Sequence, residues 1–283
     1  MPILSLEHAL TALRDNTEST ILVRHSQFNR DIAEIFAELL SRNTTLRILS
    51  LTACEINDEI LIKLLPGLKA CTSLSVLKLS WNAIYNEGAI ALAESLQDFV
   101  SLDTLYLSGN KIKAAGVEAF AVAIKTRRCH LVVLDLGHNE IRFPRAFQAL
   151  ADSLPGSGLH ELYLSNTWMD DEGAGHIANG ISKCLTIHTL SLADNRCVTD
   201  IGVRKLSGAL KAHRSLSRVF TSGTKATTKT RDKLHRLIRT LFSPQATLLT
   251  ILCSVHHVDS IGRKSHLRLL PKDLLRYLVS MLY

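Results

Sequence analysis

One short pattern of leucines returns along the chain at nearly constant spacing and constrains the fold most. In residues 102–112 it is LDTLYLSGNKI, with leucines at the first, fourth and sixth positions and an asparagine at the ninth. Frames of this kind begin at Glu18, Leu46, Leu74, Leu102, Leu131, Leu159, Ile187 and Leu216, in steps of 28 or 29 residues. Because units that repeat at such a period stack on one another, the 283 residues are predicted to form one elongated repeat fold.

Each repeat contains two segments with different periodicities. Leucines at alternate positions, such as Leu105 and Leu107, predict a very short strand with one buried face. Asn110 then turns the chain, because its side-chain amide satisfies main-chain groups where the strand ends. Residues 115–124 carry apolar side chains at helical spacing, so each repeat is predicted to be a strand, a turn and a helix.

The asparagine position is not uniform along the chain. It is held by Asn82, Asn110, Asn139 and Asn195, while Cys54 replaces asparagine in the second frame. Ser26, Thr167 and Thr224 also depart from the pattern, so the turns at these three positions are the least certain from sequence.

The period, the LxxLxLxxN strand and a helix of the form GxxxLAxxL together resemble the ribonuclease-inhibitor type of leucine-rich repeat over residues 18–238. The resemblance implies an α/β leucine-rich-repeat solenoid, or horseshoe, with about eight repeats. Parallel strands would line its concave face and helices its convex face. It also implies a non-catalytic protein-binding module, and fold analogy alone adds an inhibitor that covers an enzyme's active site. The horseshoe is similar, too, to effectors that intracellular bacteria deliver into host cells, which would make the partner a host protein or another effector.

The two ends of the chain are expected to cap the solenoid. Residues 1–17 are predicted to form an N-terminal helical cap, because apolar residues between Leu6 and Leu13 fall on one helical face. Residues 18–240 contain the repeats, and residues 241–283 are predicted to form a C-terminal helical cap.

The C-terminal segment also resembles a SOCS box. The similarity is carried by Leu249 and Cys253, by Leu270 and Pro271, and by Tyr277 and Leu278. Leu248 and His257 depart from that pattern. The alternative function that this resemblance implies is a ubiquitin-ligase substrate adaptor that binds elongins.

The charge of the chain is divided unevenly. Residues 1–202 contain 17 Lys and Arg against 23 Asp and Glu, whereas residues 203–283 contain 16 against three. The basic residues between Lys225 and Arg239 are interpreted as a solvated face, with phosphate or acidic-lipid binding as the alternative. No nucleic-acid motif accompanies them, so nucleic-acid and membrane partners are not expected.

Targeting and cysteine usage favour a reducing, cytoplasmic compartment, or the host cytosol for a secreted effector. No signal peptide is expected at the N-terminus. The six cysteines show no regular framework and are expected to be free thiols, with Cys54, Cys71 and Cys184 acting as small buried hydrophobes. No nucleophile and base occur at a known catalytic spacing, so the sequence predicts no catalytic residue, no metal and no cofactor. Histidines on the concave face (His138, His160 and His188) would be the first place to look for an enzyme site.

Side chains that point away from the buried leucines are the best candidates for binding a partner. One row occupies the position between the last two leucines of each frame, and a second row lies two residues after the last leucine. Four of the chain's 15 aromatic residues fall on these two rows, interleaved with carboxylates, which favours a protein partner with a basic patch. Trp168 and Met169 are expected to project at the rim of the same face. The predicted partner-binding residues are Lys78, Trp81, Asp103, Tyr106, Asp135, His138, Glu161, Tyr163, Trp168, Asp194, Arg218 and Phe220.

Overall fold

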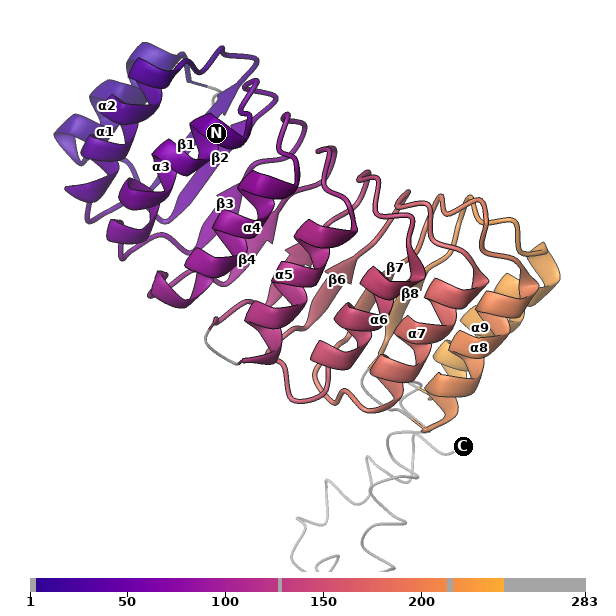
Figure 1. Ribbon diagram of the computed structural model, residues 1–283. Helices are drawn as coiled ribbons and strands as arrows, with labels where there is room; N and C mark the ends of the chain where they lie inside the picture. The colour runs from indigo at the N-terminus through magenta and orange to yellow at the C-terminus, as the bar shows by residue number, and fades with distance from the viewer. Residues whose placement is uncertain (1–3, 127–128, 213–215, 242–283) are drawn as a thin grey trace, which may run out of the picture.

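The computed structural model describes residues 4–126, 129–212 and 216–241, which form a curved stack of strand–helix repeats (Figure 1). The strands are β1 (Thr20–Arg24), β2 (Ile48–Thr52), β3 (Val76–Lys78), β4 (Thr104–Tyr106), β5 (Val133–Asp135), β6 (Glu161–Tyr163), β7 (Thr189–Ser191) and β8 (Arg218–Phe220). The helices are α1 (Leu6–Asp15), α2 (Arg30–Ser41), α3 (Asp58–Ala70), α4 (Asn86–Ser95), α5 (Ala114–Lys125), α6 (Pro144–Ser153), α7 (Asp171–Ser182), α8 (Asp200–Ala212) and α9 (Thr228–Leu241), with a short 3₁₀ turn at Leu96–Asp98.

The strands form one parallel sheet in chain order, from β1 to β8. Their register joins equivalent positions of successive frames: Ile48 pairs with Val76, Val76 with Thr104, and Thr104 with Val133. The structure therefore confirms the predicted α/β leucine-rich-repeat solenoid and its repeat spacing.

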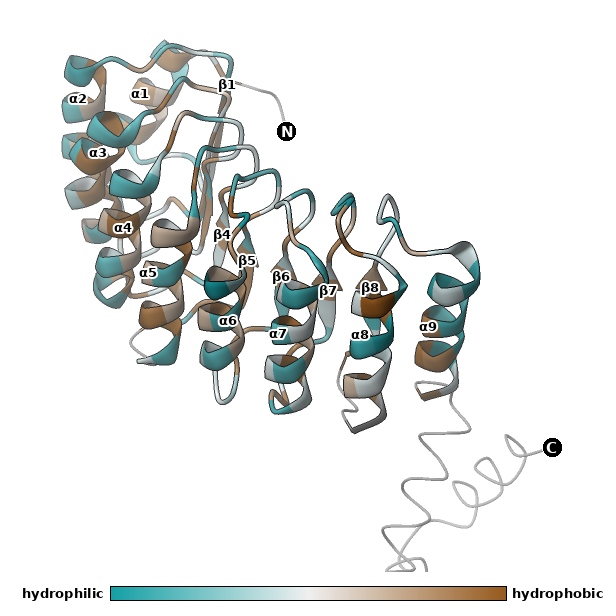
Figure 2. Cartoon of the chain, turned by 45° about the vertical axis from the view of Figure 1, so that its right-hand side comes forward, coloured by the Kyte–Doolittle hydropathy of each residue, from teal (hydrophilic) through white to brown (hydrophobic). Residues whose placement is uncertain are grey.

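The sheet is covered on one face only. The helices line one side of the stack, and the other face of the sheet is open (Figures 1 and 2). We call this open face the concave face. Within the fourth repeat, Leu105, Leu107 and Ile112 are fully buried, whereas Tyr106 is only half-buried. The same alternation in the other strands places the leucines in a continuous core beneath the sheet.

Buried asparagines join one repeat to the next. The Asn110 Oδ1 accepts the Ile84 N–H at 3.1 Å, and its Nδ2 donates to the carbonyls of Leu79 and Leu107 at 2.9 Å each. Ile84 and Leu79 belong to the preceding repeat, so this amide connects two turns. Asn82, Asn139 and Asn195 form equivalent bonds. The predicted role of the amide is confirmed, and it extends beyond its own strand.

Where another residue replaces this asparagine, it forms only some of the same hydrogen bonds. The hydroxyl of Thr167 donates to its own strand at the Leu164 carbonyl (2.9 Å), and the Thr224 hydroxyl donates to Thr221 in the same way. Cys54 is fully buried, with its Sγ 3.6 Å from the Val23 carbonyl. A hydroxyl thus satisfies the local carbonyl, but it lacks the second set of donors and acceptors that an amide offers.

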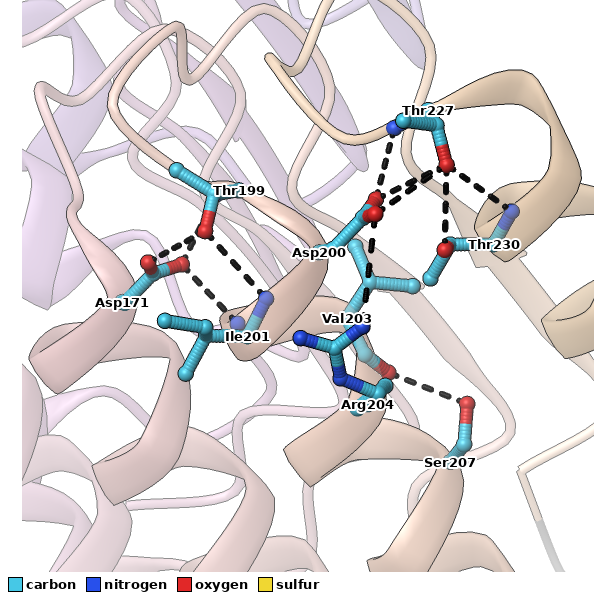
Figure 3. Close-up of polar contacts among 10 residues, drawn as sticks. Asp171, Thr199, Asp200, Ile201, Val203, Arg204, Ser207, Thr227 and Thr230 are labelled. Atoms are coloured by element: carbon cyan, nitrogen blue, oxygen red, sulfur yellow. Dashed lines mark hydrogen bonds and ion pairs between the residues drawn. The ribbon is translucent and has the colours of Figure 1, made fainter.

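A second connection between repeats runs along the first turns of the helices. Asp171 begins α7, and its Oδ1 accepts the N–H groups of Thr199 (2.7 Å) and Gly202 (2.9 Å) at the start of α8 (Figure 3). Asp200 begins α8 and accepts the Thr227 N–H at 2.7 Å, just before α9. The starts of α8 and α9 are therefore both capped by a side chain of the preceding repeat.

This capping explains the glycines at the helix starts. A Cβ placed on Gly202 would lie 2.7 Å from the Asp171 Oδ1, so a larger residue would displace the capping carboxylate. Burial by itself would raise the pKa of Asp171, but the hydrogen bonds from the Thr199 hydroxyl and from the Thr199 and Gly202 N–H groups lower that pKa below its usual value.

The N-terminal segment covers the first edge of the sheet. Helix α1 extends two residues past the predicted Leu6–Leu13, and the Ser5 hydroxyl caps its first turn. The Leu4 N–H donates to the Leu22 carbonyl at 2.8 Å, so Leu4 lies along the free edge of β1. The predicted C-terminal cap and every residue that carries the SOCS-box resemblance lie outside the described residues. In the described part of the chain, no helix has the length and apolarity needed to cross a membrane.

We expect replacement of Asn110 by alanine to reduce the free energy of unfolding by about 3 kcal/mol. The reason is that buried main-chain groups of two repeats lose their partners, at about 1–3 kcal/mol each. Asn110→Thr should be less destabilising, because threonine restores the bond that Thr167 forms in its own repeat. Urea denaturation of the two variants measures this order. Equal stability of Asn110→Ala and the wild type would contradict the role given to the amide.

We expect Asp171→Ala to destabilise the protein by about 1 kcal/mol near neutral pH, the usual cost of losing a helix cap. Asp171→Asn should be milder, because Asn86 occupies the same position in α4 and its Oδ1 accepts the Lys113 N–H at 2.9 Å.

The two Asp171 variants should also differ in their pH dependence. Because the folded pKa is depressed, the ionised carboxylate stabilises the fold above the unfolded pKa of about 4, and this contribution is lost as the pH falls through the folded pKa. The Asp171→Asn variant should therefore lose less stability than the wild type on acidification. Asp152→Asn, an exposed change on α6, is the matched control. An unchanged acid profile in Asp171→Asn would contradict this account.

Candidate functional site on the concave face

Six side chains form a row across the middle of the concave face. Strand register places Lys78, Tyr106, Asp135, Tyr163, Ser191 and Phe220 next to one another in that order. We call them the central row. Phe220 is 47% exposed, whereas Ser191 is buried, as is Ser50 at the equivalent position in β2. The prediction that this row faces the open side is thus correct for the large side chains, while the two serines are covered by their neighbours.

Tyr163 is held in place by Glu161, which lies two residues earlier on the same strand. Its hydroxyl donates to the Glu161 Oε2 at 2.5 Å, and the Glu161 Oε1 accepts from the Arg218 guanidinium at 3.2 Å. Arg218 reaches from β8 across β7 to make this ion pair. Burial, together with the adjacent Glu161 carboxylate, raises the pKa of Tyr163 to about 12. These three predicted residues therefore act as one fixed group.

Tyr106 and Asp135 lie in a less solvated part of the row. The Lys78 ammonium is 5.3 Å from the centre of the Tyr106 ring, at a distance suited to a cation–π contact. Burial, and then the charges of Glu161 and Asp135, raise the pKa of the Tyr106 hydroxyl. Burial also raises the pKa of Asp135, even though its Oδ1 accepts the Gly137 N–H at 2.8 Å.

The second predicted row lies in turns, whereas the first lies within the strands. Its residues lie in the turn after each strand, and all have left-handed backbones, with φ between 51° and 74°. The row contains His25, Ala53, Trp81, Gly109, His138, Asn166, Asp194 and Gly223. Glycine and asparagine tolerate this conformation, but a bulky residue there is an outlier. We call this set the turn row.

Trp81 uses the glycine in the next repeat as a platform. A Cβ on Gly109 would lie 2.6 Å from the Trp81 ring, so the indole occupies the space that Gly109 leaves free. The ring then contacts His138, two repeats away, with 5.4 Å between ring centres. The His138 Nδ1 is 3.1 Å from the Asn166 Nδ2. The structure therefore brings Trp81 and His138 together, and the indole remains 57% exposed.

Two predicted carboxylates lie apart from these clusters. The Asp103 Oδ1 accepts the hydroxyl of Thr104 at 2.7 Å, on the side of the face where the strands begin. Asp194 belongs to the turn row and is exposed beside Asn166 and Trp168. Neither one forms an ion pair with another described residue. They contribute negative charge to opposite margins of the concave face.

A rim of aromatic and arginine side chains continues from the turn row. The Arg142 guanidinium lies 4.5 Å from the centre of the exposed Trp168 ring, and Arg145 lies 5.6 Å from that of Phe143. Tyr85 is exposed in the equivalent loop of the third repeat. Sequence reasoning found Trp168 but missed the others, because their loops lie outside the strand pattern. The available signal was their position: Tyr85 directly follows the buried Ile84, and Arg142 and Phe143 follow the buried Ile141.

The prediction that Met169 projects at the rim is wrong. Met169 is fully buried, because it takes the core position that Ile112 and Ile141 occupy in other repeats. Its N–H donates to the Asn195 Oδ1 at 3.0 Å, which fixes this register.

The histidines of the concave face do not form an acid–base pair with a nucleophile. The rings of His160 and His188 stack with centres 4.8 Å apart, and the His160 Nδ1 is 2.8 Å from the Gly158 carbonyl oxygen. Within the described ranges, none of the recorded hydrogen bonds of His138, His160 or His188 reaches a carboxylate or a thiol. The same ranges contain no cluster of three metal-ligating side chains. The absence of catalysis and of cofactors stays a prediction.

The thiols and the basic segment match their predicted surroundings in part. Cys54, Cys71 and Cys184 are buried and unpaired, as expected, and Cys197 is exposed.

Most basic residues of α9 are exposed, whereas Leu234 and Ile238 pack into the core. This arrangement is compatible with a solvated face and does not by itself indicate an anionic ligand.

We expect the Tyr163 hydroxyl to ionise near pH 12, about two units above a free tyrosine. Because the folded pKa is raised, the Glu161 hydrogen bond stabilises the fold fully below pH ~10, and its contribution is lost as the pH rises through the folded pKa. Tyrosinate absorbance after a rapid pH jump measures this ionisation, as the difference between the wild type and Tyr163→Phe. Glu161→Gln should lower the pKa. Tyr85→Phe, which removes an exposed tyrosine, is the control, and ionisation of Tyr163 near pH 10 would contradict the assignment.

Comparison with known proteins identifies the repeat. Segments 42–65, 70–93, 101–121, 128–142 and 183–207 match the family model described as Leucine Rich repeat. No curated protein sequence is significantly similar to the chain.

Solved structures that resemble part of the chain include the following two. The actin-binding site 2 of leiomodin-1 is 19% identical, with a TM-score of 0.46, and the match covers 54% of this chain and 89% of that one. The tropomodulin C-terminal domain of Caenorhabditis elegans is 16% identical, with a TM-score of 0.44, over 53% of this chain and 92% of that one. Neither likeness bears on function. The matched repeats and the eight-stranded parallel sheet together show that the chain folds as a leucine-rich-repeat solenoid.

Proposed function

We propose that this protein is a non-catalytic binding module that holds a protein partner on its concave face. The supporting observation is two groups of large side chains on this face that already have partners in the free protein. Tyr163 is held by Glu161 and Arg218, and Trp81 rests over Gly109 against His138. Little side-chain order would have to be gained on binding, so more of the contact energy appears as affinity.

Trp81 is the strongest single candidate for an anchor. A tryptophan at a φ of 60° costs backbone strain that glycine would avoid, and the neighbouring repeat does use glycine at Gly109. The exposed indole does not contribute to the core. Tryptophan and tyrosine are the residues that most often dominate the energy of protein interfaces. The presence of an exposed tryptophan in a strained backbone conformation therefore favours a role in recognition.

The charges of the face favour a partner with a basic patch. Asp103, Asp135 and Asp194 lie in the fourth, fifth and seventh repeats, among the repeats that carry the aromatic side chains, and none forms an ion pair with another described residue. Complementary charge accelerates encounter and rejects partners of the wrong sign. The rim formed by Tyr85, Phe143 and Trp168 extends the aromatic surface beyond the strands.

The consequence of binding depends on the partner. If the partner is an enzyme, a bound horseshoe could cover its active site, as the ribonuclease-inhibitor resemblance implies. If the chain is a bacterial effector, the partner would be a host protein or another effector, in the host cytosol. Both ideas are proposals that rest on resemblance. The cytoplasmic location is a proposal that rests on the cysteine usage and the N-terminal sequence. The adaptor alternative rests on the C-terminal segment, outside the described residues, and predicts capture of elongins.

The proposal is tested by affinity purification with the wild type and with a Trp81→Ala, Tyr106→Ala, Tyr163→Ala triple variant. Loss of a central aromatic anchor typically costs about 2 kcal/mol or more, so the triple variant should bind the principal partner at least about 30-fold more weakly.

A matched control removes exposed apolar side chains elsewhere, through Val122→Ala and Leu185→Ala. This control should keep the partner, and circular dichroism should show that both variants are folded. Equal recovery of the partner by the wild type and the triple variant would show that the concave face is not the binding surface.

A further inference from the structure

One carboxylate of the central row is partly buried without a positive charge in contact with it. Asp135 lies on β5 between its register neighbours, Tyr106 on β4 and Tyr163 on β6. Its Oδ1 accepts the Gly137 N–H at 2.8 Å. Among the described residues, no Lys, Arg or His side chain forms an ion pair with Asp135. His138 is near enough to favour the ionised form but makes its recorded contacts with Trp81 and Asn166.

The neighbouring carboxylate shows the opposite situation. Glu161 accepts the Tyr163 hydroxyl on one oxygen and the Arg218 guanidinium on the other. Its charge and its hydrogen-bonding capacity are therefore largely satisfied within the protein. Of these two adjacent acids, Asp135 is the one whose charge has no ion-pair partner among the described residues, and it has more capacity left for an external cation, since one N–H uses only one of about four acceptor positions.

Partial burial of the Asp135 charge has an energetic cost. Burial raises the pKa of this carboxyl group, which means that its surroundings disfavour the ionised form. A cation placed against the carboxylate would offset this cost, and the effect is larger than at a fully solvated site because water screens the pair less. The site is therefore better suited to a positively charged group than exposed Asp194 is.

The aromatic rings on either side of Asp135 favour a guanidinium group over an ammonium group. The Tyr106 and Tyr163 side chains project from the strands on either side of Asp135, so a bound group would contact aromatic surface as well as the carboxylate. The Tyr106 ring already has the Lys78 ammonium 5.3 Å from its centre. Guanidinium is planar, stacks on aromatic rings and donates two parallel hydrogen bonds to a carboxylate, whereas an ammonium is compact and more strongly hydrated. Arginine fits this combination better than lysine.

We propose that Asp135, between Tyr106 and Tyr163 on the neighbouring strands, receives an arginine side chain of the protein partner. This inference rests on the proposed function, because it names one chemical feature that a concave-face partner presents. It adds a specific locus, Asp135, and a specific side chain to the general expectation of a basic patch.

The inference is tested with short probes rather than with the unknown partner. The probes are the capped tripeptides acetyl-Gly-Arg-Gly-amide, its lysine counterpart and its citrulline counterpart, which keeps the shape of arginine without the charge. Each is titrated at low ionic strength into the full-length protein, and the Gly137 amide, which is bonded to Asp135, is followed by NMR. We expect saturable shifts with the arginine probe, and at least about tenfold weaker binding of citrulline.

Two variants locate the effect on the face. Asp135→Asn keeps the size of the side chain and should weaken the arginine probe by about tenfold or more, whereas Asp194→Asn should leave it within about twofold. The inference is overturned if Asp135→Asn binds arginine as the wild type does, or if citrulline or lysine binds as tightly as arginine.

The outcome is separable from that of the proposed function. Suppose that the partner recovered by the wild type is lost by the Trp81, Tyr106 and Tyr163 triple variant but binds Asp135→Asn normally. The concave face would then be correct and the arginine assignment wrong. Loss of the partner in Asp135→Asn, with retention in Asp194→Asn, supports both.

Discussion

A buried side-chain amide between successive turns is the interaction on which the rest of this structure depends. The strands are three to five residues long, and such short strands provide few ladder hydrogen bonds. Each repeat must therefore satisfy buried main-chain groups where the strand ends. Asn110 does this by accepting from Ile84 and donating to Leu79 and Leu107 at once. Aspartate could not donate, and threonine has a single hydroxyl hydrogen, so it cannot donate to the carbonyls of two repeats at once.

The position that lacks the amide shows what it normally contributes. Where Thr167 replaces asparagine, the preceding loop takes a different course: Arg142 has a left-handed backbone, and its N–H donates to the Thr167 main-chain carbonyl at 3.1 Å. The next residues, Phe143 and Pro144, then begin α6, whose N-cap residue makes no side-chain cap bond, as at α4 and α5. This loop places the Arg142 guanidinium over the Trp168 ring and leaves Phe143 exposed against Arg145. A local departure from the structural pattern thus coincides with the aromatic rim.

The sequence predicts those parts of the fold that depend on periodicity and misses those that depend on conformation. Leucine spacing gave the strand order, the register and the buried face, because alternation across a strand leaves only one arrangement with all leucines inside. Spacing could not show that the turn row is left-handed, since residues as different as Trp81 and Ala53 occupy it. Spacing did indicate the core position of Met169, which stands at the eleventh position of its frame as Ile112 and Ile141 do, and the prediction of a rim residue overlooked it. For the candidate site, it identified the aligned side chains but not which of them are already partnered.

Two carboxylates of the concave face occupy similar positions but differ in the partners that they have inside the protein. Glu161 and Asp135 lie on adjacent strands, yet the first is tied to Tyr163 and Arg218 while the second has only the Gly137 N–H. A charge that is paired inside the protein orients its neighbours but gains little from an external cation. An unpaired, partly buried charge gains more, because the incoming group offsets a desolvation cost already present in the free protein. The internally paired acid thus orients Tyr163, and the unpaired one is where the proposed arginine of a partner would bind.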